Sequence, residues 1–193
     1  MWWNNSIIEG NAYQVLLWFV LYSILGWLVE SVYMSICNRK ITNRGFARGP
    51  MCPIYGFGAL TVFFTLHPYS ENPVRLFLLG MFLATTLEFI TARIMQRFFG
   101  EIWWDYQEKP FNYQGIICLE SSIAWGFYTV ALFFFLHKMI VSMVDYVPAR
   151  AGKILGSVIL GAYLIDFAMV VYREKKNDLA EVLEEPDEVS PVQ

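Results

Sequence analysis

Long uninterrupted runs of apolar residues dominate this chain and restrict what it can fold into. An α-helix needs about 20 such residues to cross a bilayer, where it satisfies its own backbone hydrogen bonds. Five runs follow one another, at residues 12–36, 54–69, 74–97, 116–141 and 153–172. Only 16% of the 193 residues are charged, against about 25% in an average soluble domain. The sequence therefore predicts an all-α, polytopic membrane helical bundle with about five transmembrane helices.

The second run is the weakest, because it is short, opens with Pro53 and contains Gly56 and Gly58. It fits either a tilted span, which we favour, or a re-entrant element. Residues 1–172 are expected to form a single transmembrane domain. Residues 173–193 are acidic and are expected to form a cytoplasmic tail, which extends the last helix for a few turns and is then largely disordered.

Basic residues beside the spans predict an orientation, because cytoplasmic loops are enriched in Lys and Arg. One side of the membrane would carry Arg39, Lys40, Arg44, Arg48, Arg97, Lys109, Arg173, Lys175 and Lys176. The other side would carry only Arg75, Lys138, Arg150 and Lys153. This asymmetry predicts an N-terminus outside and a C-terminus in the cytoplasm. The net charge of -3 argues against a nucleic-acid partner, and membrane lipids are the expected surroundings.

A weak internal repeat relates the first two runs to the next two. The first helix of each pair carries an acid, Glu30 or Glu88, and leads to a loop with an Asn, an aromatic residue and a Gly. A cysteine and then an aromatic–Gly–Phe triplet follow: Cys52 with Tyr55-Gly56-Phe57, and Cys118 with Trp125-Gly126-Phe127. The match is short and gapped, so chance similarity stays open as the alternative. Parallel repeats of this kind place a site at their interface in some transporters.

Four acidic side chains lie within the predicted spans, on four different helices. An ionised acid at a helix centre costs about 2.5–3.5 kcal/mol on insertion scales, so such groups normally face protein or water. At 1.5 Å per residue, Glu30 and Asp166 would lie roughly 9 Å, Glu120 roughly 6 Å and Glu88 roughly 14 Å from the cytoplasmic ends of their helices. All four carboxylates are therefore expected in the inner half of the membrane.

Basic and amide side chains near this depth provide partners for the acids. Arg44 and Arg48 lie among glycines, in a loop whose backbone N–H groups suit an anion, and arginine adds a planar fork for carboxylate or phosphate. The predicted ligand-binding set is Glu30, Asn43, Arg44, Arg48, Glu88, Arg93, Asp105, Asn112, Glu120 and Asp166. Either these residues bind an anionic ligand or lipid headgroup, or the arginines only neutralise the buried acids and hold the bundle together. Asp105 either completes this cluster or belongs to an interfacial aromatic belt.

The sequence predicts no cofactor and no metal site. Cys37, Cys52 and Cys118 contain no CxxC pair, and His67 and His137 are predicted at the outer ends of helices. Neither a Ser-His-Asp arrangement nor a P-loop is visible. This chain is therefore not expected to hydrolyse ATP itself.

Five segments of the chain resemble a bacterial family of putative ABC-transporter permeases, CmpB-like. They are GWLVES at 26–31, NRGFARGPMCPIYGFG at 43–58, LEFIT at 87–91, WWDY at 103–106 and FNYQGIICLESSIAWG at 111–126. One departure is Ile116, where the family pattern has Arg after the glycine. The resemblance implies an integral protein of the bacterial inner membrane, and a separate ATPase subunit as its partner.

Three functions fit these observations. The first is a permease-like component that binds or moves a small or lipid-like solute through an inner-leaflet polar pocket. The second is an intramembrane enzyme that acts on a phosphate-bearing lipid, with a carboxylate as base and arginines as anion clamp. The third is a non-catalytic scaffold or regulator of another membrane protein. We expect the first, and expect that the chain is not an enzyme.

Overall fold

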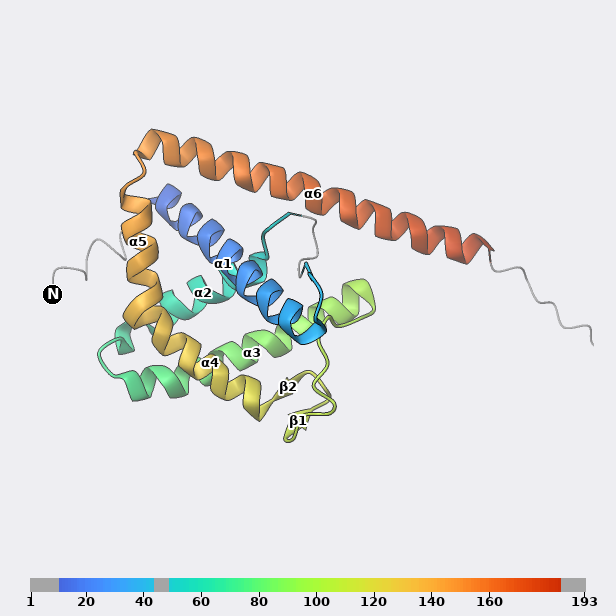
Figure 1. Ribbon diagram of the computed structural model, residues 1–193, viewed down its shortest axis with the longest axis horizontal. Helices are drawn as coiled ribbons and strands as arrows, with labels where there is room; N and C mark the ends of the chain where they lie inside the picture. Colours follow the sequence, from blue (N-terminus) through green and yellow to red (C-terminus); the bar gives the residue numbers. More distant parts are fainter. Residues whose placement is uncertain (1–10, 44–48, 185–193) are drawn as a thin grey trace, which may run out of the picture.

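The computed structural model describes residues 11–43 and 49–184, with side chains as far as Arg173. The helices in these residues are α1 (Ala12–Asn38), α2 (Pro53–Leu66), α3 (Pro73–Phe99), α4 (Leu119–Ala131), α5 (His137–Asp145) and α6 (Ala149–Glu184) (Figure 1). A 3₁₀ turn, η1 (His67–Tyr69), follows α2, and a π-helical turn, η2 (Leu132–Leu136), joins α4 to α5. Two short antiparallel strands, β1 (Asn112–Tyr113) and β2 (Ile117–Cys118), lie before α4.

Four of these helical stretches are long and apolar enough to cross a membrane. They are Ala12–Asn38, Pro73–Phe99, Leu119–Asp145 and Ala149–Arg173, and each agrees with a predicted run to within a few residues. The short helix α2 has 14 residues, which is about 21 Å of helix against a hydrocarbon core of about 30 Å. The all-α membrane bundle is therefore confirmed, with four long helices and a shorter fifth.

Helix α3 shows how local sequence sets the ends of these elements. Pro73 occupies the first turn, and the Asn72 side chain accepts hydrogen bonds from the backbone N–H groups of Val74 and Arg75 at 3.1 and 3.0 Å. Such a side-chain cap satisfies amides that have no partner within the helix. Gly100 ends the helix with φ of 74°, a left-handed conformation that favours glycine.

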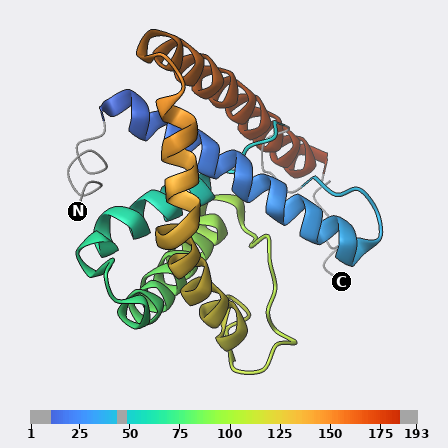
Figure 2. The ribbon, with the colours of Figure 1, turned by 60° about the vertical axis from the view of Figure 1, so that its left-hand side comes forward.

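Two helix pairs, α1 with α2 and α3 with α4, make the most extensive contacts in the bundle. Helix α6 packs mainly on α1, where Gly152 and Gly156 lie against Leu16 and Leu17. Its C-terminal part extends beyond the other helices (Figure 1), and Figure 2 shows α6 on the outside of the bundle next to α1. Large apolar side chains on α6, such as Ile154 and Leu164, are exposed, as expected for a surface that faces lipid.

The loops that follow α1 and α3 each fold back along the preceding helix. After α1 ends at Asn38, the indole nitrogen of Trp27 donates to Asn43 Oδ1 at 2.6 Å, and the backbone N–H of Cys52 donates to the Ser23 carbonyl at 3.0 Å. These partners lie roughly 16 Å and 22 Å along α1 from its end. Non-helical backbone at membrane depth is tolerated only where protein or water surrounds it. The first loop is therefore expected to be surrounded by protein or water at this depth.

Candidate functional site

Each of the two helix pairs contains an equivalent hydrogen bond from an aromatic side chain to a glutamate. In the first pair, the Tyr55 hydroxyl donates to Glu30 Oε2 at 2.8 Å. In the second pair, the Trp125 indole N–H donates to Glu88 Oε2 at 3.1 Å. Each donor is the first residue of an aromatic–Gly–Phe triplet, and each acid lies on the preceding long helix. The repeat predicted from the sequence is thus present in these contacts.

The remaining residues of the two triplets repeat the same packing. A Cβ added at Gly56 would lie 2.7 Å from the carbonyl oxygen of Phe19. A Cβ added at Gly126 would lie 2.7 Å from the ring of Phe77. The next residue of each triplet packs edge-on against that same phenylalanine. The ring centroids are 4.8 Å apart for Phe19 with Phe57 and 5.0 Å apart for Phe77 with Phe127. Each phenylalanine of the long helix precedes its glutamate by the same number of residues.

Glu88 lies in the second half of α3, about 16 Å from its C-terminal end, and is held by three neutral donors. Tyr106 Oη donates to Oε1 at 3.1 Å and Trp125 Nε1 donates to Oε2 at 3.1 Å, while Ser121 Oγ shares its one proton between Oε2 at 3.3 Å and the Cys118 carbonyl at 3.0 Å. Tyr106 comes from the loop that folds back along α3, and the other two donors come from α4. A carboxylate can accept about four hydrogen bonds. The three protein donors therefore fix the orientation of Glu88 and leave acceptor capacity.

A further polar group lies one helical turn from Glu88. The hydroxyl oxygen of Thr85 is buried and has no hydrogen-bond partner among the described residues. A threonine within a helix usually donates to the carbonyl four residues earlier, which Thr85 does not do. Residues three apart share a helix face, so this hydroxyl lies on the same side of α3 as the acid.

The two acid sites interact through their tyrosine donors. The Tyr55 hydroxyl, which donates to Glu30, lies within electrostatic range of Tyr106, which donates to Glu88. An electrostatic interaction between the two tyrosine donors, one from each helix pair, thus links the two acid sites. We refer to Glu30, Tyr55, Glu88 and Tyr106 as the paired-acid site.

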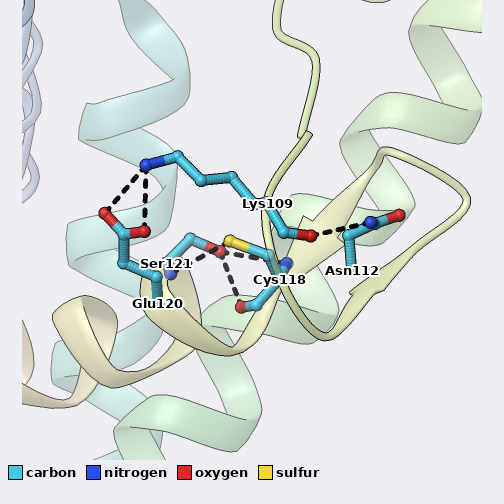
Figure 3. A network of polar contacts seen from close by, with 5 residues as sticks. All are labelled: Lys109, Asn112, Cys118, Glu120 and Ser121. Carbon is cyan, nitrogen blue, oxygen red and sulfur yellow. Dashed lines mark hydrogen bonds and ion pairs between the residues drawn. The ribbon is translucent and has the colours of Figure 1, made fainter. Parts of the chain in front are cut away.

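The other two predicted acids have different partners. Asp166 Oδ2 accepts a hydrogen bond from the backbone N–H of Gly49 at 2.9 Å, which attaches α6 to the first fold-back loop. Glu120 was expected roughly 6 Å inside a span, but α4 begins at Leu119, so Glu120 lies in its first turn. There it forms a 2.9 Å ion pair with Lys109, with side chains 66% and 47% exposed (Figure 3). This hydrogen-bonded pairing raises the pKa of Lys109.

Two of the predicted ligand residues organise the second fold-back loop instead. Asn112 donates to the Lys109 carbonyl at 2.8 Å (Figure 3). It also donates to the Gln107 carbonyl at 3.1 Å and accepts from the Gly115 N–H at 3.1 Å. Asp105 is exposed, and its Oδ1 accepts from the Gln107 N–H at 2.8 Å. Both side chains satisfy backbone groups of a tight turn.

The arginines expected near the acids are placed only in part. Arg93 is exposed, donates to Gln96 at 3.0 Å and to Gln114, and lies over the Phe89 ring. Its interactions in the described chain are thus with amides and an aromatic ring. Arg44 and Arg48 fall outside the described residues, while Asn43, just before them, accepts from Trp27.

One group of buried polar side chains was missed by the sequence interpretation. His137 was predicted at the outer end of a helix, but it lies two turns inside the continuous helix Leu119–Asp145 and is only 2% exposed. Its Nδ1 is 2.7 Å from the Tyr22 hydroxyl. Tyr22 and His137 are polar residues within apolar runs, and their position there is the sequence signal that could have indicated this group.

Comparison with known protein families identifies the chain. The model of a family described as putative ABC-transporter type IV matches residues 17–171. The match covers most of α1, all of α2 to α5, the first part of α6 and the paired-acid site. The chain belongs to this family. Searches of curated proteins and of solved structures gave no match.

Membership of the putative type IV ABC-transporter family, together with four apolar helices, identifies a multi-pass membrane protein associated with transport. An ATPase partner is consistent with the family description. The sequence itself contains no P-loop. A transporter family also favours a non-enzymatic role for this chain.

Proposed function

We propose that this protein is the membrane component of a transport system and binds a small or lipid-like solute at the paired-acid site. The observation that carries the proposal is the set of three neutral donors around Glu88. A carboxylate within an apolar bundle is costly, and these donors orient it without supplying a charge. The remaining acceptor capacity suits a solute that presents an ammonium or hydroxyl group.

Two features support a binding role over a purely structural one. Donors from a loop and from α4 converge on Glu88, as expected for a preorganised site. The Thr85 hydroxyl on the same helix face is buried without a partner in the described chain, so a solute there would satisfy it. Arg44 and Arg48 would contact an anionic group of the solute, and a separate ATPase chain would supply ATP hydrolysis. The cytoplasmic half of the membrane is the proposed location.

Changing Glu88 to Gln tests this proposal, because it removes the ionisable group and nearly preserves the volume. Trp125→Phe is the matched structural variant, since it removes one donor to the same oxygen and keeps the carboxylate. Each variant should lower the free energy of unfolding by about 1–3 kcal/mol, the cost of a lost hydrogen bond to a charged or buried group. Glu120→Gln makes the same chemical change at the exposed ion pair.

The readouts are melting in detergent and complementation of a strain that lacks the gene. We expect Glu88→Gln to abolish complementation, Trp125→Phe to reduce it less because the carboxylate and its other donors remain, and Glu120→Gln to behave as the unchanged protein. If Glu88→Gln and Trp125→Phe lose stability and complementation in parallel, Glu88 only holds the bundle together and the proposed binding role is wrong.

A further inference from the structure

A second group of buried polar side chains lies in the bundle core, away from the paired-acid site. Trp18, Tyr22 and His137 are 1%, 3% and 2% exposed. Trp18 lies about 18 Å along α1 from Glu30, in the N-terminal half of that helix. The three side chains come from α1 and from α5, which are distant in the sequence and in contact in the fold.

Aromatic rings enclose the imidazole of His137. The Phe63 ring stacks on it with a centroid distance of 3.8 Å, and the Trp18 ring meets it edge-on at 5.0 Å. Its Nδ1 makes a 2.7 Å hydrogen bond with the Tyr22 hydroxyl. The other imidazole nitrogen, Nε2, and the indole nitrogen of Trp18 are both buried and have no hydrogen-bond partner among the described residues.

The tautomer of His137 follows from counting the groups that each choice leaves unsatisfied. If Tyr22 donates to Nδ1, the proton of the neutral ring is on Nε2, and the unsatisfied groups are two donors, Nε2–H and Trp18 Nε1–H. If Nδ1–H donates to Tyr22, the hydroxyl proton of Tyr22, the Nε2 lone pair and the Trp18 N–H are all unsatisfied. Because each buried unsatisfied group is costly, the first arrangement is favoured.

We propose that Trp18 Nε1–H and His137 Nε2–H bind a small hydrogen-bond acceptor inside the bundle, either a water molecule or a small monovalent anion such as chloride. Both unsatisfied groups are donors on rings in contact, so the occupant must accept. Buried polar atoms of this kind usually hold ordered water in globular proteins. The π-helical turn Leu132–Leu136 ends directly before His137, and such turns occur frequently at functional sites.

The two histidines of the chain make a direct test practical. The full-length protein, labelled with ¹⁵N-histidine and reconstituted in lipid at neutral pH, gives ring signals from His67 and His137 alone, and His67→Gln assigns them. We expect the His137 Nδ1 signal to be that of an unprotonated nitrogen and the Nε2 signal to be that of a protonated, hydrogen-bonded nitrogen.

Variants and salt exchange then identify the acceptor. Trp18→Phe removes one of the two donors and should shift the Nε2 signal of His137. The control is Trp104→Phe, which should leave this signal unchanged, because the Trp104 indole donates to the Ile116 carbonyl at 2.8 Å in the second fold-back loop. An Nε2 signal that moves when gluconate replaces chloride supports an anion, and one that stays supports water. A protonated Nδ1, or an Nε2–H without a hydrogen bond, would overturn the proposal without affecting the proposed role of Glu88.

Discussion

At the scale of single residues, glycines set how closely the helices of each pair approach. Gly56 lies against Phe19 and Ser23 of α1, and Gly126 lies against the Phe77 ring of α3. Close approach through small residues is the usual way for helices to pack within a membrane. It also places the preceding aromatic residue, Tyr55 or Trp125, within reach of its glutamate.

Two glycines of α2 allow this role to be measured. A Cβ at Gly56 would lie 2.7 Å from the Phe19 carbonyl oxygen, which belongs to the helix backbone, whereas a Cβ at Gly58 would meet nothing within 4 Å. Gly56→Ala should therefore lower the free energy of unfolding by about 1–3 kcal/mol, as overpacking does. Gly58→Ala should be neutral or stabilise by up to about 1 kcal/mol, from helix propensity. Thermal unfolding in detergent gives both values, and equal losses would contradict the role of Gly56.

The sequence indicated Glu30 and Glu88 because a charged group within an apolar run is costly and needs a partner. It could not give the depth of Glu120, because the Cys118 cap sets the start of α4: Cys118 Sγ accepts from the Ser121 N–H at 3.3 Å. Nor could it show that Asn112 and Asp105 satisfy loop backbone groups. Amide and carboxylate side chains serve ligands and turns equally well, and only the fold distinguishes the two uses.

At the scale of elements, the long helices were predictable and the loops were not. Apolar runs give the spans directly, because a hydrocarbon surrounding requires them. The second fold-back loop depends instead on three left-handed residues, Phe111, Gln114 and Gly115, with φ of 53°, 57° and 70°, and on hydrogen bonds from Asn112. The pattern of apolar residues contains no information about such a turn.

The Asn112 side chain should hold the second fold-back loop in place. Asn112→Ala removes two donated hydrogen bonds and one accepted hydrogen bond, so amide hydrogen exchange across residues 106–117 should become faster, at least tenfold for a loss of about 1.4 kcal/mol or more. Lys109→Ala removes only the exposed ion pair with Glu120, which contributes about 0–1 kcal/mol, and exchange should change little. Slow exchange in Asn112→Ala would show that the loop is held by other contacts.

At the scale of the whole molecule, α2 decides how the chain crosses the membrane. The two loops with most of the basic residues follow α1 and α3, and this asymmetry supports a cytoplasmic location for both. Because α3 also crosses the membrane, these two loops can lie on the same side only if α2 crosses it in the opposite direction. Helix α2 and η1 together, residues 53–69, reach about 26 Å, and the fold-back of the first loop starts α2 at the level of Ser23, well inside the bundle. A short helix can therefore complete the crossing.

Cysteine accessibility tests this arrangement from both sides. Cys37 is exposed near the end of α1, whereas Cys52 and Cys118 are buried, so Cys52→Ala with Cys118→Ser leaves a single native reporter. A second reporter, Glu71→Cys with Cys37→Ser added, lies in the exposed turn between α2 and α3. A membrane-impermeant maleimide should label the Glu71→Cys variant in intact cells and the Cys37 variant only in inside-out vesicles. Labelling of both reporters from the same side would mean that α2 is re-entrant, and labelling of Cys37 from outside would reverse the predicted orientation.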